Sequence, residues 1–238
     1  MTLSESDSRG HTMWRAVLIA LTMLIAVPAH AASFDCKGVP SPDELIVCND
    51  PLLSALDTQL PRVQEKAERE KRAETRQVLR DFTSDRSSCG SNRSCVLSTY
   101  IAVLGELGGA KSIPADITAS TIAGGRAKPS PTLPAKIGQC SVTNVTEVHP
   151  RVGQDPIKDE DYDAGTGIEY ANEGYQVSYA REEALIASKP GDKVTMCLIA
   201  IPKRCPQGDD RGREYFVTNA RTGQSWAMAD SQHACGGP

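Results

Sequence analysis

Eight cysteines constrain this chain of 238 residues more than any other feature. They fall into two groups of four, one toward each end of the mature chain: Cys36, Cys48, Cys89 and Cys95, then Cys140, Cys197, Cys205 and Cys235. Only 39% of the residues are hydrophobic and 5% are aromatic, so the apolar core is thin. Disulfides commonly stabilise such chains, and the even split predicts that pairs form within each group.

The N-terminal residues have the pattern of an export signal. Two arginines precede an apolar run from Ala16 to Val27, which is shorter than the roughly twenty residues that span a bilayer. Small residues at Ala29 and Ala31 predict cleavage after Ala31, with an uncleaved N-terminal anchor as the alternative. We therefore predict a signal peptide over residues 1–31. The mature chain is expected in the periplasm or outside the cell, with no stable membrane span, and its cysteines are expected to pair.

Each group of four cysteines allows three pairings. In the first group we favour Cys36–Cys48 and Cys89–Cys95, because both close short loops across helix starts. In the second group we assume Cys140–Cys197 and Cys205–Cys235, although no sequence argument selects this pairing over the other two. The rival in the first group is Cys48–Cys89, which would join the start of one helix to the end of its antiparallel neighbour. A metal site is the alternative for either group, but the C-x-x-C spacing of structural zinc sites is absent.

Composition divides the mature chain into three segments. Residues 32–107 have helical patterns, and residues 138–238 have strand and turn patterns. Between them, residues 108–137 are rich in Pro, Gly, Ala, Ser and Thr, which predicts an extended, mobile linker. The fold class expected is α + β in separate modules, with a small helical domain followed by a small all-β domain, each stapled by disulfides.

Helix signals are clear in the first module. Ser41 to Glu44 combines an N-cap serine, a proline at the first helical position and a glutamate three residues after the cap, and Asp50-Pro51 repeats the start signal. Pro61 predicts a kink or break. The charged stretch 64–76 predicts a solvated helix surface or a turn between helices. A last helix is expected over 95–107, with a buried stripe of Leu97, Tyr100, Ile101 and Leu104.

The second module alternates between apolar and polar residues with the period of strands. We predict about six short antiparallel strands, over 140–148, 168–171, 175–179, 193–201, 214–218 and 224–228. The stretch 193–201 is nearly continuous in apolar residues, so it is expected at the centre of the sheet. A small antiparallel barrel or sandwich is the predicted architecture.

The first module resembles a known family over residues 34–107. Its motifs are Phe34-Asp35-Cys36, the segment from Cys48 to Leu53, the helix face Leu56-Asp57-x-x-Leu60, and a later segment in which Phe82 takes the place of a tryptophan before Arg86-x-x-Cys89. These are similar to the N-terminal domain of the LprI-like family of secreted lysozyme inhibitors. The resemblance implies a disulfide-stapled helical domain that binds lysozyme and blocks its cleft sterically.

Such an inhibitor needs no catalytic group, because the working carboxylates belong to lysozyme. An acidic surface would speed encounter with a basic enzyme. Residues 32–110 hold twelve acidic and ten basic residues, and residues 139–238 hold fifteen and ten. The net charge of −4 argues against nucleic-acid binding. We therefore predict a non-enzymatic protein without cofactor, with lysozyme as the candidate partner. The alternative is an envelope adaptor whose β domain binds glycan or a partner protein, and a third hypothesis is a cell-wall hydrolase.

Two features of the second module suggest ligand contacts. Arg211 and Arg213 lie in a Gly-flanked loop beside Cys205 and could bind a carboxylate or a sugar, although a surface turn pinned by a disulfide explains the loop more simply. Tyr215 and Trp226 could form a face on which sugars stack, but aromatic residues on strands more often belong to the core.

Three aspartates at alternate positions, Asp159, Asp161 and Asp163, raise the question of a calcium loop. An EF-hand loop counted from Asp159 needs Gly at its sixth and Glu at its twelfth position, where Ala164 and Tyr170 stand. A solvated acidic loop is the simpler interpretation, and we predict no metal site.

Ser231 and His233 follow Asp230, which supplies the residue types of a hydrolase triad. A triad is defined by geometry, however, and no nucleophile-elbow motif is present. We predict no catalytic residue.

Overall fold

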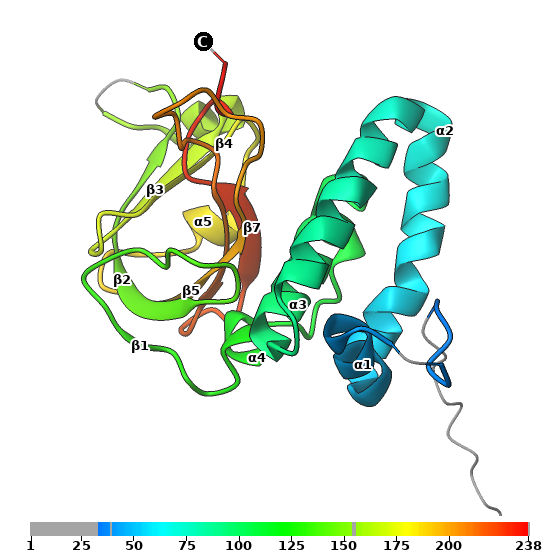
Figure 1. Cartoon of the computed structure of the whole chain (residues 1–238). Coiled ribbons are helices and arrows are strands. Elements are labelled where there is room, and N and C mark those ends of the chain that lie inside the picture. The colour runs from blue at the N-terminus through cyan, green and yellow to red at the C-terminus, as the bar shows by residue number, and fades with distance from the viewer. Residues whose placement is uncertain (1–32, 39, 154–155, 238) are drawn as a thin grey trace, which may run out of the picture.

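The computed structural model describes residues 33–38, 40–153 and 156–237. The predicted signal peptide lies outside the described residues. Helices form one half of the molecule and a curled sheet forms the other, side by side (Figure 1). Among the described residues, no helix combines the length and apolar character that a membrane span requires.

The helical half contains α1 (Pro42–Asn49), α2 (Pro51–Ser88) and α3 (Arg93–Gly108). The predicted starts of the first two helices are confirmed. The backbone N–H of Ser41 donates to the Glu44 carboxylate at 2.9 Å, as in a capping box. The carboxylate of Asp50 accepts from the first turn of α2, at 3.0 and 3.1 Å from two backbone nitrogens.

The predicted kink at Pro61 is wrong. The helix continues through this exposed proline, and the non-helical residue within α2 is Lys71, with φ −143° and ψ 63°. There the chain turns back, so α2 is a hairpin of two helical arms (Figure 1). The reversal falls inside the charged stretch 64–76, which has little apolar surface to bury against a neighbour.

The sheet half contains seven strands: β1 (Lys128–Pro129), β2 (Cys140–Pro150), β3 (Thr166–Tyr170), β4 (Tyr175–Ser178), β5 (Lys193–Ala200), β6 (Glu214–Asn219) and β7 (Ser225–Ala229). Six of them are antiparallel, in the order β4-β3-β2-β5-β6-β7, and the short β1 pairs with β2 in parallel. The prediction of about six antiparallel strands with 193–201 near the centre is confirmed. The sheet curls into a half-barrel.

The side chain of Gln176 bridges the two edge strands of the half-barrel, β4 and β7. It is fully buried, and its amide nitrogen donates to the backbone oxygens of Tyr215 and Met228, both at 2.9 Å. Its amide oxygen accepts from the Trp226 indole at 2.9 Å and from the Tyr170 hydroxyl at 2.7 Å. A satisfied buried network thus joins edges that share no backbone ladder.

Strand β5 is buried on both faces, which explains its nearly continuous apolar sequence. Val194, Met196 and Leu198 lie inside the half-barrel. Cys197 and Ile199 belong to a second hydrophobic cluster, together with the buried stripe of α3. This cluster extends from the helices to the outer face of the sheet, so the prediction of separate modules is not confirmed. The coarser α + β assignment holds.

The predicted extended linker is wrong for much of residues 108–137. This segment contains the 3₁₀ turn η1 (Ala110–Ser112), the short helix α4 (Ala119–Ala123) and β1. Thr118 caps α4, and Ile117 and Ile122 are buried in the cluster shared by helices and sheet. Ile117, Ala119 and Ile122 pack this part of the chain against α3 and the sheet. The remaining short helices are η2 (Asp159–Ala164) and α5 (Glu183–Ile186).

All eight cysteines are paired. The structure contains the four favoured pairs: Cys36–Cys48, Cys89–Cys95, Cys140–Cys197 and Cys205–Cys235. The third bridge joins residues that face each other on β2 and β5. The fourth ties the loop after β5 to the C-terminal segment. No bridge links the helical half to the sheet half, so their contact depends on packing and polar interactions.

Candidate functional site

The arginines predicted as a ligand loop are neutralised within that loop. Arg211 pairs with Asp209 at 2.8 Å, and Arg213 pairs with Asp210 at 2.6 Å. The Asp209 carboxylate also accepts from the backbone N–H of Gly236 at 2.9 Å, which holds the loop to the C-terminal segment. The geometry favours the pinned surface turn over a carboxylate- or sugar-binding loop.

The aromatic pair predicted as a sugar-stacking face lies in the core. Tyr215 is 1% exposed and Trp226 is 6% exposed, and both pack inside the half-barrel. Their faces are covered by other side chains, so a glycan cannot stack on them. The favoured core interpretation is therefore confirmed, and the sugar-stacking alternative is wrong.

The three alternating aspartates are held by hydrogen bonds within the protein. Arg181 bonds to Asp159 at 2.9 Å and to Asp163 at 3.3 Å, and Asp161 accepts from the backbone N–H of Lys158 at 2.8 Å. An arginine therefore supplies the positive charge in this loop. Within the described ranges, no three His, Cys, Asp or Glu residues are placed to hold a metal ion.

The Ser231, His233 and Asp230 side chains do not form a triad. The Ser231 hydroxyl donates to the backbone oxygen of His233 at 2.8 Å. The Asp230 carboxylate accepts from the backbone N–H groups of Gly212 and Arg213, at 2.8 and 3.1 Å. These contacts stabilise turns, and none of them would activate the serine hydroxyl.

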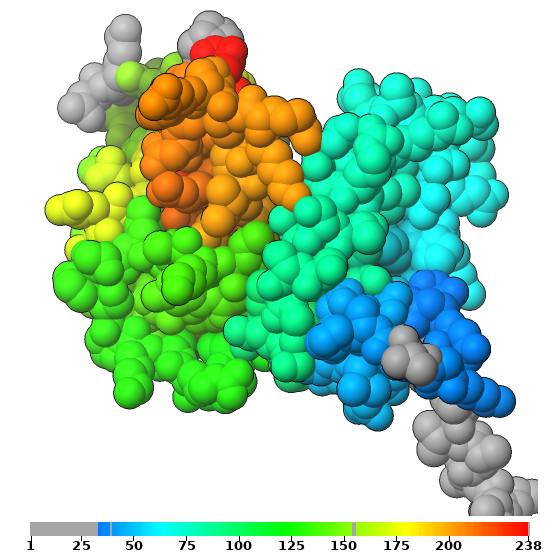
Figure 2. All heavy atoms as spheres, in the orientation of Figure 1, coloured from blue at the N-terminus to red at the C-terminus, as the bar shows by residue number. Residues whose placement is uncertain are grey.

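A cleft between the two halves is the candidate site that the sequence analysis missed. It is a cavity of about 290 Å³ between α2, α3 and the loop that follows β5. Figure 2 shows this loop, in orange, against the teal helices. The residues that line the cleft are Val78, Asp81, Phe82, Asp85, Thr99, Ala102, Val103, Glu106, Ile199 to Arg204, Gly212, Glu214 and Ala234.

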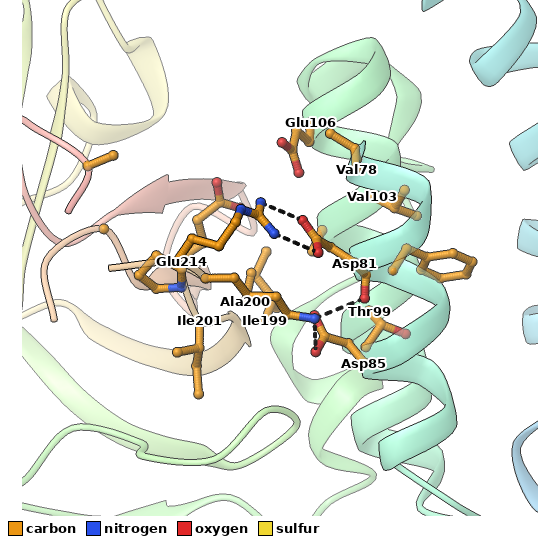
Figure 3. Close-up of a pocket in the computed structure, with 17 residues that line it drawn as sticks. Val78, Asp81, Asp85, Thr99, Val103, Glu106, Ile199, Ala200, Ile201 and Glu214 are labelled. Atoms are coloured by element: carbon orange, nitrogen blue, oxygen red, sulfur yellow. Dashed lines mark hydrogen bonds and ion pairs between the residues drawn. The ribbon is translucent and has the colours of Figure 1, made fainter. Parts of the chain in front are cut away.

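Two ion pairs cross the cleft from the loop to α2 (Figure 3). The guanidinium of Arg204 binds both oxygens of Asp81, at 2.8 and 3.1 Å, and Lys203 binds Asp85 at 2.8 Å. Arg204 has a φ of 64°, a left-handed conformation that is uncommon for a residue with a side chain. The loop therefore turns sharply at the residue whose side chain reaches α2.

Two further carboxylates in the cleft have no such partner. Glu106 comes from α3 and lies at the exposed rim, whereas Glu214 begins β6 and is partly buried. Neither carboxylate has a hydrogen bond or ion pair with another described residue. Burial and the negative charge of Glu106 raise the pKa of Glu214 to about 7. Burial and the charge of Asp81 raise the pKa of Glu106, although the nearby charge of Arg204 partly offsets them. The hydrogen bond from Arg204 lowers the pKa of Asp81.

The cleft therefore has four carboxylates against two cations, so at neutral to alkaline pH it carries a net negative charge. Its inner wall is apolar, formed by Val78, Phe82, Val103 and Ile199. An apolar wall beside carboxylates suits a lysine or arginine side chain, whose alkyl stem packs while its charged end stays polar. The only sequence signal for this cleft was the spacing of Asp81 and Asp85 on one helix face, and this spacing is equally typical of an ordinary solvated helix surface.

The residues that carry the family resemblance form a buried network in the helical half. Arg86 bonds to Asp43 at 2.9 Å and to the Tyr100 hydroxyl at 3.3 Å, and that hydroxyl donates to Asp57 at 2.7 Å. Phe82 packs edge-on against Tyr100, with ring centroids 5.0 Å apart. Asp57, Phe82 and Arg86 therefore hold the helices together.

The chain was compared with protein-family models, curated proteins and solved structures, and none of them matched.

Proposed function

We propose that this chain is a non-enzymatic protein of the periplasm or extracellular space that binds another protein, and that its partner is lysozyme. The resemblance of residues 34–107 to LprI-like inhibitors names the partner. The observation that carries the proposal is the cleft, in which neither Glu106 nor Glu214 forms an ion pair with a described residue. A basic side chain of the partner inserts there, and the body of the inhibitor then covers the active cleft of the enzyme.

Electrostatics support this pairing. Lysozyme of the common animal type has a basic surface, and opposite potentials speed encounter and fix orientation. The carboxylates lie against an apolar wall, where a bound cation is partly removed from water and each charge pair is stronger than on an open surface. Four disulfides and no free cysteine fit a protein of an oxidising compartment.

The test is the rate of cell-wall lysis by lysozyme in the presence of the purified chain from residue 32 onward. The whole chain is needed, because the helices and the sheet share one hydrophobic cluster. We expect inhibition at micromolar concentration that weakens as salt is added. If the chain does not slow lysis at that concentration, the inhibitor proposal is wrong, and direct binding would then distinguish an adaptor for another protein.

Paired variants locate the binding site. Glu106→Gln with Glu214→Gln removes two charges from the cleft, and we expect inhibition to weaken at least tenfold. Glu70→Gln with Glu169→Gln removes the same charge from exposed positions outside the cleft and should leave inhibition unchanged. Equal inhibition by both double variants would place the contact elsewhere on the molecule.

A further inference from the structure

The cleft carboxylates Glu106 and Glu214 lie on opposite halves of the molecule. Glu106 belongs to α3 in the helical half, and Glu214 belongs to β6 in the sheet half, and both line the same cavity (Figure 3). When both are ionised, their repulsion acts across the contact between the halves. When one is protonated, this repulsion is gone.

We propose that Glu106 and Glu214 form a pH-responsive pair of carboxylates, which keeps the cleft closed in mildly acidic solution and loosens it above neutral pH. The inference concerns the free protein and requires no ligand, so it does not depend on the proposed function.

The surrounding charges leave Glu214 without compensation. The nearest cations are already engaged, Arg204 with Asp81 and Lys203 with Asp85. The C-terminal segment and the loop before β6 contribute only Ala234 and Gly212 to the lining. The charged side chains that line the cleft with Glu214 are Asp81 and Asp85 on α2, Glu106 on α3, and Lys203 and Arg204 after β5.

The direction of the response follows from the titration of Glu214. Its pKa in the folded protein, about 7, lies above the ordinary value of 4.5. A group with a raised pKa stabilises the closed form below its ordinary pKa and loses that contribution as pH rises through the raised value. Asp81 has a lowered pKa and stays ionised throughout, so its pair with Arg204 does not produce the transition.

The loop of residues 201–213 is the part expected to move. It is bound to α2 by two ion pairs, and Ile201 is 40% exposed. Directly after Arg204, the Cys205–Cys235 bridge holds the loop to the C-terminal segment. The buried residues of β5, such as Cys197 and Ile199, remain packed against α3 because the hydrophobic cluster does not titrate.

The test is amide hydrogen exchange of the whole chain at pH 5.5 and pH 8.5, with rates divided by the intrinsic chemical rate at each pH. If Glu214 is fully solvated in the open form, its titration raises the opening constant by about thirtyfold between these two values. We expect protection in peptides covering 199–214 and the facing part of α3 to fall at least fivefold. Protection of the β2–β3 pair should stay constant.

Variants decide the outcome. Glu214→Gln should abolish the fall in protection, and Glu169→Gln on β3 should retain it. The proposal is overturned if the corrected exchange rates of the wild-type protein do not change with pH. It is also overturned if the fall in protection persists in Glu214→Gln. If that variant does not fold, carboxyl NMR titration of the wild-type protein is decisive, because a Glu214 midpoint below pH 5.5 refutes the inference.

Discussion

Arg86 is the buried cation on which the helical half depends, and its replacement by methionine is the sharpest test of that half. The side chain is 11% exposed and lies beside two carboxylates that are almost fully buried, Asp43 and Asp57. Its guanidinium also stacks over the rings of Phe34 and Phe82, with centroid distances of 5.3 and 5.5 Å. Arg86→Met keeps much of the volume but leaves both carboxylates without a cation.

The cost follows from the loss of one partner of a buried ion pair, which destabilises proteins by about 3–5 kcal/mol. Domains are typically stable by about 5–15 kcal/mol, so a large share of the free energy of unfolding should disappear. For a chain of this size, the midpoint of thermal unfolding should fall by roughly 6–20 °C. The assay is denaturant unfolding followed by far-UV circular dichroism at pH 7, without reductant.

A pH series adds a second check on the same variant. Burial raises the pKa of Asp43, but hydrogen bonds from Ser41 and Arg86 outweigh it, so the pKa is lowered on balance. A lowered pKa stabilises the fold above the ordinary value of 3.8 and loses this contribution as pH falls further. The difference between wild type and Arg86→Met should therefore shrink below about pH 4, because the wild type loses this stabilisation.

Arg80→Met is the matched control, since Arg80 lies on the same arm of α2 but is exposed and contacts only Gln77. Surface changes of this kind usually alter stability by less than about 0.5 kcal/mol. If Arg86→Met lowers the free energy of unfolding no more than Arg80→Met does, the buried network does not stabilise the fold. The structural role assigned to Asp57, Phe82 and Arg86 would then be wrong.

Three further predictions concern the sheet half. Gln176→Leu should cost about 2–4 kcal/mol, since it leaves the Trp226 indole unpaired in the core; a cost below 1 kcal/mol in denaturant unfolding would contradict this. Gly138 has a φ of 82° and lies against the backbone of α3, so Gly138→Ala should lower the free energy of unfolding by about 2 kcal/mol or more. Gly125 has a similar φ but faces open space, so Gly125→Ala should lower it by only about 1 kcal/mol. Hydrogen bonds, the strongest of them from Arg221, hold the pKa of the buried Asp192 well below its ordinary value. Asp192→Asn should therefore lower the free energy of unfolding at pH 7, and its difference in stability from wild type should narrow as pH falls below 4.

Local signals in the sequence were sufficient for most individual elements. Caps at Ser41 and Asp50 located two helix starts, and alternation located the strands, because both depend on residues close together in the chain. The favoured cysteine pairs also occur, and those of the helical half close short loops. The kink predicted at Pro61 is absent, because the packing of the rest of α2 outweighs one lost hydrogen bond on an exposed helix face.

The contact between the halves could not be predicted in the same way. Ile117 and Ile122 look like isolated apolar residues in a polar segment until α3 and β6 are placed beside them. The sequence favours a core position for Tyr215 and Trp226 but leaves a surface position open, and only the curl of the sheet decides that they are buried.

The sequence by itself determined the cysteine spacing, the helix and strand types and the mild acidity of the chain. The tertiary structure alone decided the candidate site, because the ion pair between Asp81 and Arg204 joins residues 123 positions apart. Glu106 and Glu214 are likewise brought into one cleft only by the packing of α3 against the sheet. That packing removes Glu214 from water and sets it near the charge of Glu106, and both effects raise the pKa of Glu214.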